Sequence, residues 1–144
     1  MKITALLEGE FHNDGKGPGL ERVIWSHGGV ILKGFEYLNP EDEDNEDNIK
    51  HLKLVEVEAF SMTTEEVHGN VLMTKDSVAG IFRIDDSDWM KQFKSDHLDS
   101  CNHYQFIFHS EIYDVICHEV KVGEGRLLSN MQTVEDNNAR PLPK

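Results

Sequence analysis

The chain has 144 residues, with 14 lysines and arginines against 27 aspartates and glutamates, so its formal charge is −13. This length predicts one hydrophobic core that needs neither a disulfide nor a metal for stability. The acidic balance excludes ordinary nucleic-acid binding, which requires a basic surface, and it disfavours contact with an anionic membrane.

The amino-terminal segment, residues 1–11, contains one lysine and an apolar run that Glu8 interrupts after a few residues. Such a run is too short for the apolar region of a signal peptide and far too short to span a bilayer. Without an export signal, Cys101 and Cys117 are expected to be reduced thiols. We therefore expect a cytoplasmic protein.

Apolar residues recur mainly at a spacing of two in the first part of the chain, which is typical of strands. We expect a first strand within residues 3–11, followed by a hairpin whose strands flank Ser26-His27-Gly28-Gly29. The glycines there permit the positive φ that a tight turn requires. Residues 49–60 resume the alternation, and its change of phase near Val55 predicts a β-bulge.

The middle of the chain is less regular. Residues 61–76 leave two alternatives open, a short helix starting near Thr63 or a second hairpin, and residues 78–84 predict a strand. Residues 85–98 predict a helix that Asp86 or Ser87 caps. Its apolar face would hold Met90, Phe93 and His97.

Residues 103–120 predict two antiparallel strands joined at Ser110-Glu111. In that register His103 stands directly across from His118. The opposite sheet face is half apolar, so the helix or a second subunit is expected to cover it. Alternation gathers six residues on the core face: Tyr104, Phe106, Phe108, Tyr113, Val115 and Cys117.

Together these elements predict an α+β fold. We expect a mainly antiparallel, strongly bent or barrel-like β-sheet with one or two helices packed against it. Residues 1–128 would form a single globular domain. Residues 129–144 lack periodicity and are expected to form a flexible C-terminal tail.

The last hairpin also offers a candidate metal site. If its first strand extends back by two residues, Cys101 joins His103 and His118 on one face, with His109 or Asp114 nearby. One thiolate and two imidazoles are a plausible ligand set for zinc. No CxxC or HxxxH motif accompanies them, and an ordinary polar sheet face explains the same residues.

Other catalytic patterns fail on their chemistry. Cys117 and His118 are neighbours in a strand and point to opposite faces, so they cannot act as nucleophile and base. Ser26-His27-Gly28-Gly29 is similar to the glycine-rich oxyanion loop of esterases. Those enzymes also need a Gly-x-Ser-x-Gly motif that carries the nucleophile, and the sequence contains none. The glycines at 15–19 lack the lysine and serine or threonine of a phosphate loop, and the acidic run from Asp42 lacks the glycine and final glutamate of a calcium loop.

The leading hypothesis is a small, acidic, non-enzymatic domain that binds a cationic protein, in one version an immunity-type protein that covers it. The acidic segment would steer the partner, and an aromatic side chain would anchor it. The alternatives are a metal-binding protein or metal-dependent enzyme using Cys101, His103 and His118, and a homodimer formed through the half-apolar sheet face. The predicted binding residues are Trp25, Tyr37, Glu41, Asp42, Glu43, Asp44, Glu46 and Asp47.

Overall fold

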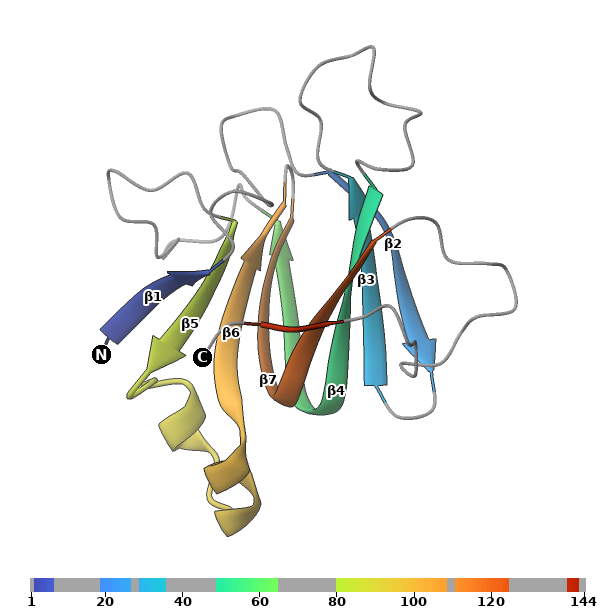
Figure 1. Cartoon of the computed structure of the whole chain (residues 1–144). Helices are drawn as coiled ribbons and strands as arrows, with labels where there is room; N and C mark the ends of the chain where they lie inside the picture. Colours follow the sequence, from blue (N-terminus) through green and yellow to red (C-terminus); the bar gives the residue numbers. More distant parts are fainter. Residues whose placement is uncertain are drawn as a thin grey trace.

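The structure is a computed structural model that describes residues 2–6, 19–26, 29–35, 49–64, 80–108, 111–124 and 140–142. Over these residues the chain forms eight strands: β1 Lys2–Leu6, β2 Gly19–Ser26, β3 Gly29–Phe35, β4 Ile49–Thr64, β5 Ile81–Asp85, β6 Asn102–Ile107, β7 Glu111–Glu124 and β8 Arg140–Pro141. They form one sheet in the order β1-β5-β6-β7-β4-β3-β2, with β8 paired to β7 (Figure 1). Every pairing in it is antiparallel.

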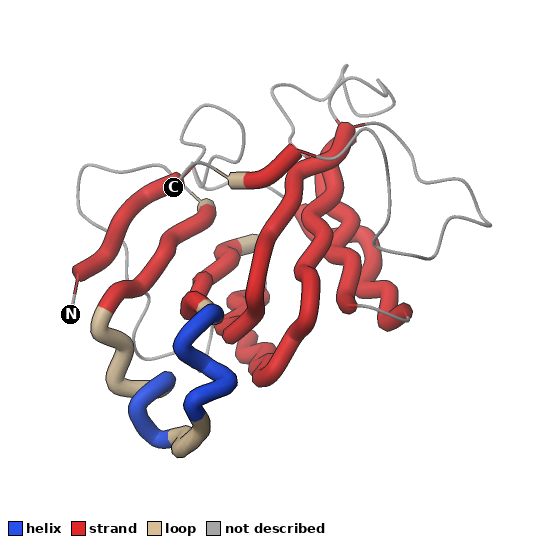
Figure 2. Tube along the Cα trace, turned by 60° about the horizontal axis from the view of Figure 1, so that its bottom comes forward, coloured by secondary structure: helices blue, strands red, loops and turns tan. Residues whose placement is uncertain are grey.

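The predicted α+β class is wrong. Within the described residues, helical structure is confined to two short 3₁₀ turns, η3 Met90–Gln92 and η4 Asp96–Ser100. They lie together between the end of β5 and the start of β6 (Figure 1 and Figure 2). The sheet is open rather than closed into a barrel, and no long helix packs against its described part. None of the helices described is long and apolar enough to cross a membrane.

The helix predicted over residues 85–98 is replaced by these two turns. Ser87 Oγ does accept a hydrogen bond from Met90 N at 3.1 Å, but the N-cap residue of η3 is Trp89, whose side chain makes no capping hydrogen bond. The backbone is extended at Phe93 and again at Ser95, which separates η3 from η4. Contacts with the sheet outweigh the helical spacing, because the ring of Trp89 packs edge-on against His103, with 5.0 Å between ring centroids.

Two predicted features of the amino-terminal half are confirmed. Strands β2 and β3 pair as a hairpin in which Ser26 faces Gly29. In β4 the register shifts between Val57 and Ala59, and Glu56 has a φ of 51°, so the predicted bulge lies just beyond Val55. The bulge brings both Leu54 and Val57 to the core cluster although they are three residues apart.

The last hairpin has the predicted face but a different register. Phe108 N donates to Glu111 O, and Ile107 faces Ile112, so the strands meet one residue earlier than at Ser110-Glu111. His103 therefore lies across from Ile116, and the predicted pairing with His118 is wrong. Each residue of β6 pairs with a partner two positions away from the predicted one, so every side chain stays on its predicted face of the sheet. All six predicted core residues belong to the main cluster.

The two sheet faces carry separate apolar clusters. The main face holds the larger cluster, and the second face holds Phe82, Ile107 and Ile112 with Ile3 and Ala5 packed against them. His103 and Gln105 lie on this second face, where both are buried within a single chain. That face therefore needs no second subunit to cover these residues. The main cluster consists of Leu6, Val30, Leu52, Leu54, Ile81, Tyr104, Phe106, Phe108, Tyr113, Val115, Cys117, Val120, Val122 and Leu142.

Part of the expected tail belongs to the sheet. Pro141 pairs with Lys121, Arg140 pairs with Val122, and Leu142 N donates to Val120 O at 3.0 Å. The Leu142 side chain is buried in the main cluster. Residues 125–139 lie outside the described residues, so the prediction of a tail is not tested over most of its length.

Candidate functional site

Trp25 is the one predicted binding residue that the structure describes. It lies on β2, at the end of the strand order, and 63% of its surface is exposed. Its ring packs edge-on against Phe60 with 4.9 Å between centroids, and Phe60 lies 5.4 Å from the ring of Tyr113. The other predicted binding residues lie outside the described residues: Tyr37, Glu41, Asp42, Glu43, Asp44, Glu46 and Asp47.

The ring contacts form a path from the surface to the core. Tyr113 is buried and its ring lies 5.8 Å from that of Phe108, which is also buried. Met62, two residues after Phe60 on the same strand, is 52% exposed. Because side chains alternate along a strand, Met62 is on the same sheet face as Phe60. We call Trp25, Phe60 and Met62 the aromatic surface.

The structure does not bring Cys101, His103 and His118 together. Cys101 Sγ lies 4.0 Å from the carbonyl oxygen of His97. His118 is exposed and lines a separate hollow of about 330 Å³ with Arg83 and Tyr104. Among the described residues, no group of three or more potential ligands has a metal-binding arrangement.

Both ring nitrogens of His103 are already hydrogen-bonded. Nδ1 lies 2.7 Å from Ser87 Oγ, and Nε2 lies 2.8 Å from Asp114 Oδ1. Gln105 Nε2 donates to the same carboxylate oxygen at 3.1 Å. An ionised carboxylate only accepts, so Nε2 carries a proton, and a neutral ring then accepts the Ser87 hydroxyl proton at Nδ1.

A serine, a histidine and a carboxylate in this sequence of hydrogen bonds resemble the chain that activates a nucleophile in hydrolases. Here the Ser87 side chain faces inward, since the residue is only 4% exposed, and its oxygen also accepts from Met90 N. This series of hydrogen bonds is therefore suited to holding the segment that contains η3 against the second face of the sheet. Sequence reasoning missed it because Ser87 and His103 are 16 residues apart and share no local motif.

The two thiols have environments that favour the protonated form. Burial raises the pKa of Cys117 to about 12, and the Cys101 thiol adds to the effect. Burial also raises the pKa of Cys101, and the nearby carboxylates of Glu58 and Glu56 raise it further. Since the thiolate is the form that attacks or binds metal, neither cysteine is prepared for such chemistry near neutral pH.

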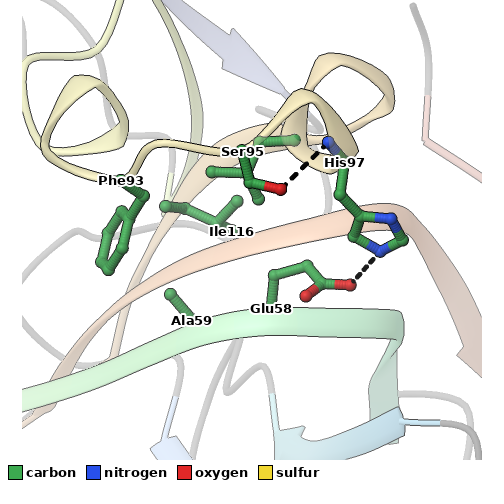
Figure 3. Close-up of a pocket in the computed structure, with 7 residues that line it drawn as sticks. Glu58, Ala59, Phe93, Ser95, His97 and Ile116 are labelled. Atoms are coloured by element: carbon green, nitrogen blue, oxygen red, sulfur yellow. Dashed lines mark hydrogen bonds and ion pairs between the residues drawn. The ribbon is translucent and has the colours of Figure 1, made fainter.

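A small hollow of about 160 Å³ lies where the segment with η3 and η4 meets the second face (Figure 3). Ala59 of β4 and Ile116 of β7 lie across from each other at its base. At its rim, His97 Nε2 lies 2.6 Å from Glu58 Oε1, although these residues are 39 positions apart in the sequence. Its full lining is Glu58, Ala59, Phe93, Ser95, His97, Leu98 and Ile116.

Comparisons of the chain with protein-family models, with curated proteins and with solved structures found no match.

Proposed function

We propose that this protein is a non-enzymatic binding module for a basic protein, with the aromatic surface as its anchor. The observation that carries the proposal is the exposure of Trp25 together with its support by aromatic rings that lead into the core. Tryptophan is enriched among the residues that dominate binding energy at protein interfaces. A tryptophan that is already ordered loses little conformational freedom when a partner covers it.

The net charge supports a basic partner. A formal charge of −13 attracts cationic surfaces and repels other acidic proteins, which speeds the correct encounter. The acidic segment 41–47 remains part of the proposal as the steering surface, and Tyr37 remains part of it as the alternative anchor. Met62 adds a flexible apolar side chain beside the anchor, a residue type that adapts well to partner surfaces.

The test compares proteins captured from native lysate by immobilised wild type, Trp25→Ala and Pro141→Ala. Pro141 is the control, because it is an exposed residue of β8 that belongs neither to the aromatic surface nor to the lining of the hollow of about 160 Å³. We expect wild type and Pro141→Ala to retain a basic protein that Trp25→Ala loses. The purified partner should bind Trp25→Ala at least about tenfold more weakly, the size of effect that removal of an anchor residue produces.

Salt provides a second arm of the test. Raising sodium chloride from about 0.05 M to about 0.5 M should weaken capture, because charge attraction is screened at high ionic strength. Equal capture of a basic protein by wild type and Trp25→Ala would contradict the proposal. Capture of only neutral or acidic proteins would contradict it as well.

A further inference from the structure

The hollow on the second face combines an apolar base with an acidic rim. Ala59, Ile116 and Leu98 supply aliphatic carbon, and the ring of Phe93 stands at one side (Figure 3). Ile116 is completely buried, so the base is fixed by the sheet. A ligand that enters the hollow would therefore place apolar atoms against a rigid surface.

Glu58 is the lining residue with a full negative charge, and it lies between the apolar base and solvent. Its side chain is 33% exposed, and Oε1 is held by His97 at 2.6 Å. The second carboxylate oxygen, Oε2, has no hydrogen bond to any of the described residues. It can accept a hydrogen bond from a ligand without displacing His97.

The surroundings of the hollow are also negative. Asp96 and Asp99 belong to η4, the turn that also contains His97, and both are exposed. The negative field of Glu58 and Glu56 reaches inward as far as Cys101, whose pKa it helps to raise. An anionic ligand would be repelled, and one carboxylate with one imidazole is too few ligands for a structural metal site.

The size of the hollow limits the ligand. A protein cavity of about 150 Å³ binds benzene, so a hollow of 160 Å³ holds on the order of six non-hydrogen atoms. A chain of four methylene groups that ends in an ammonium group has this size. Its methylenes would contact Ala59 and Leu98 above the buried Ile116, while the ammonium group donates to Glu58.

We propose that this hollow is a binding site for an alkylammonium group of about four carbons, supplied either by a lysine side chain of a protein or by a free small amine. The proposal does not depend on the aromatic surface, because Ala59 and Phe60 are adjacent in β4 and point to opposite faces.

The site is tested by NMR titration of the isotope-labelled full chain with two probes, n-butylammonium and a lysine capped as its N-acetyl methylamide. Each probe should shift the backbone signals of Ala59, Leu98 and Ile116 in a saturable manner. Neutral butanol and N-acetylated capped lysine should bind at least fivefold more weakly, since they lack the cation. If both probes bind, the ligand is a lysine side chain of a protein. If butylammonium alone binds, the ligand is a free small amine.

Three variants separate the roles of the lining residues. Glu58→Gln should weaken binding at least fivefold, and Ala59→Leu should abolish it by filling the base. His97→Gln should leave binding unchanged or strengthen it, because it releases Glu58 from a competing partner. Glu111→Gln is the matched control, because Glu111 lies at the far end of β7 and faces Thr64.

Melting temperatures of all four variants confirm that each is folded before titration. The proposal is overturned if neither probe binds wild type saturably, or if Glu58→Gln and Glu111→Gln bind the probes equally well. It is also overturned if His97→Gln weakens binding as much as Glu58→Gln. None of these outcomes bears on capture through Trp25, so the two proposals fail separately.

Discussion

Gly123 on β7 lies directly across from His51 on β4, and the imidazole ring occupies the space where a side chain would be. A Cβ atom at position 123 would come within 2.0 Å of His51 Nε2. His51 is only 1% exposed, so its ring has no room to move into solvent. We expect Gly123→Ala to lower the free energy of unfolding by about 2 kcal/mol or more, the usual cost of overfilling a packed site.

The interaction of the two positions is measured by a double-mutant cycle in urea. In a His51→Ala background the added methyl group has space, so Gly123→Ala should cost less than about 0.5 kcal/mol. The two substitutions would then show a coupling of more than about 1 kcal/mol. Additive effects would mean that another contact determines the need for glycine.

Ser87 connects the segment with η3 to the sheet through one oxygen atom. Ser87→Ala removes the partner of His103 Nδ1 and the acceptor of Met90 N. Leaving such groups without partners at a buried site should cost about 1–3 kcal/mol of unfolding free energy, measured in urea. Ser100→Ala is the control, because Ser100 is exposed and its hydroxyl donates a long bond of 3.4 Å to His97 O.

Chemical labelling of Ser87 distinguishes a structural role of this residue from a catalytic one. A fluorophosphonate reagent should leave Ser87 unmodified in the native protein, because the residue is 4% exposed. Rapid labelling of Ser87 at neutral pH, detected by peptide mass spectrometry, would show instead that the hydrogen-bonded chain activates a nucleophile.

At the scale of the element, β8 extends the sheet beyond Asn102, the first residue of β6. Strand β6 pairs with β7 up to Cys117, and β8 pairs with Lys121 and Val122 of β7. Leu142 follows β8 and is 8% exposed. Leu142→Ala should therefore lower the unfolding free energy by about 2 kcal/mol, as expected for a buried leucine.

The control for this experiment is Pro141→Ala, since Pro141 is exposed and pairs with Lys121 through the backbone. It should change the unfolding free energy by less than about 0.5 kcal/mol. If Leu142→Ala has as little effect as Pro141→Ala in urea unfolding, residues 140–142 behave as a tail in solution.

The elements that were predicted from sequence are those whose signals are local. The hairpin at Ser26 to Gly29 follows from turn chemistry, and the bulge in β4 follows from a change of apolar phase. The core face of β6 and β7 was also predictable, because a shift of partners by two positions leaves every side chain on its own face. The register itself was not, because the predicted turn had no glycine or asparagine to fix its position.

The segment from 85 to 98 shows why the second face was not predictable. Its spacing of apolar residues favours a helix, yet Trp89 packs on His103, and Phe93 and Leu98 line the hollow. These contacts involve strands far along the chain and carry no signal within the segment. The pairing of Glu58 with His97 was missed for the same reason.

At the scale of the whole molecule, buried titratable groups make stability depend on pH. Burial raises the pKa of Cys117 from its ordinary value of 9.0 to about 12. Burial also raises the pKa values of Tyr104 and Tyr113 above 10.0. Lys53 acts in the opposite direction, because burial, with a smaller effect of Lys121, lowers its pKa below 10.5.

The sign of each contribution follows from which state holds more protons. Between pH 9 and 12 the folded protein keeps the Cys117 proton that the unfolded chain loses, so this stability is present below pH 9 and lost as the pH rises. The two tyrosines contribute the same loss at higher pH. Lys53 destabilises the folded state below its ordinary pKa, and that penalty fades as the pH approaches 10.5.

We therefore expect Cys117 to lower the unfolding free energy of wild type, measured in urea, by about 1–2 kcal/mol between about pH 9 and pH 10.5, while Lys53 offsets part of this loss. Cys117→Ala should be less stable than wild type at pH 7, because it leaves a cavity, but its stability should decline less steeply. Val115→Ala is the matched control, because Val115 is equally buried on the same face and does not titrate. Its pH profile should run parallel to that of wild type. If Cys117→Ala and Val115→Ala have equal slopes above pH 9, the thiol of Cys117 is not the group whose proton the fold retains.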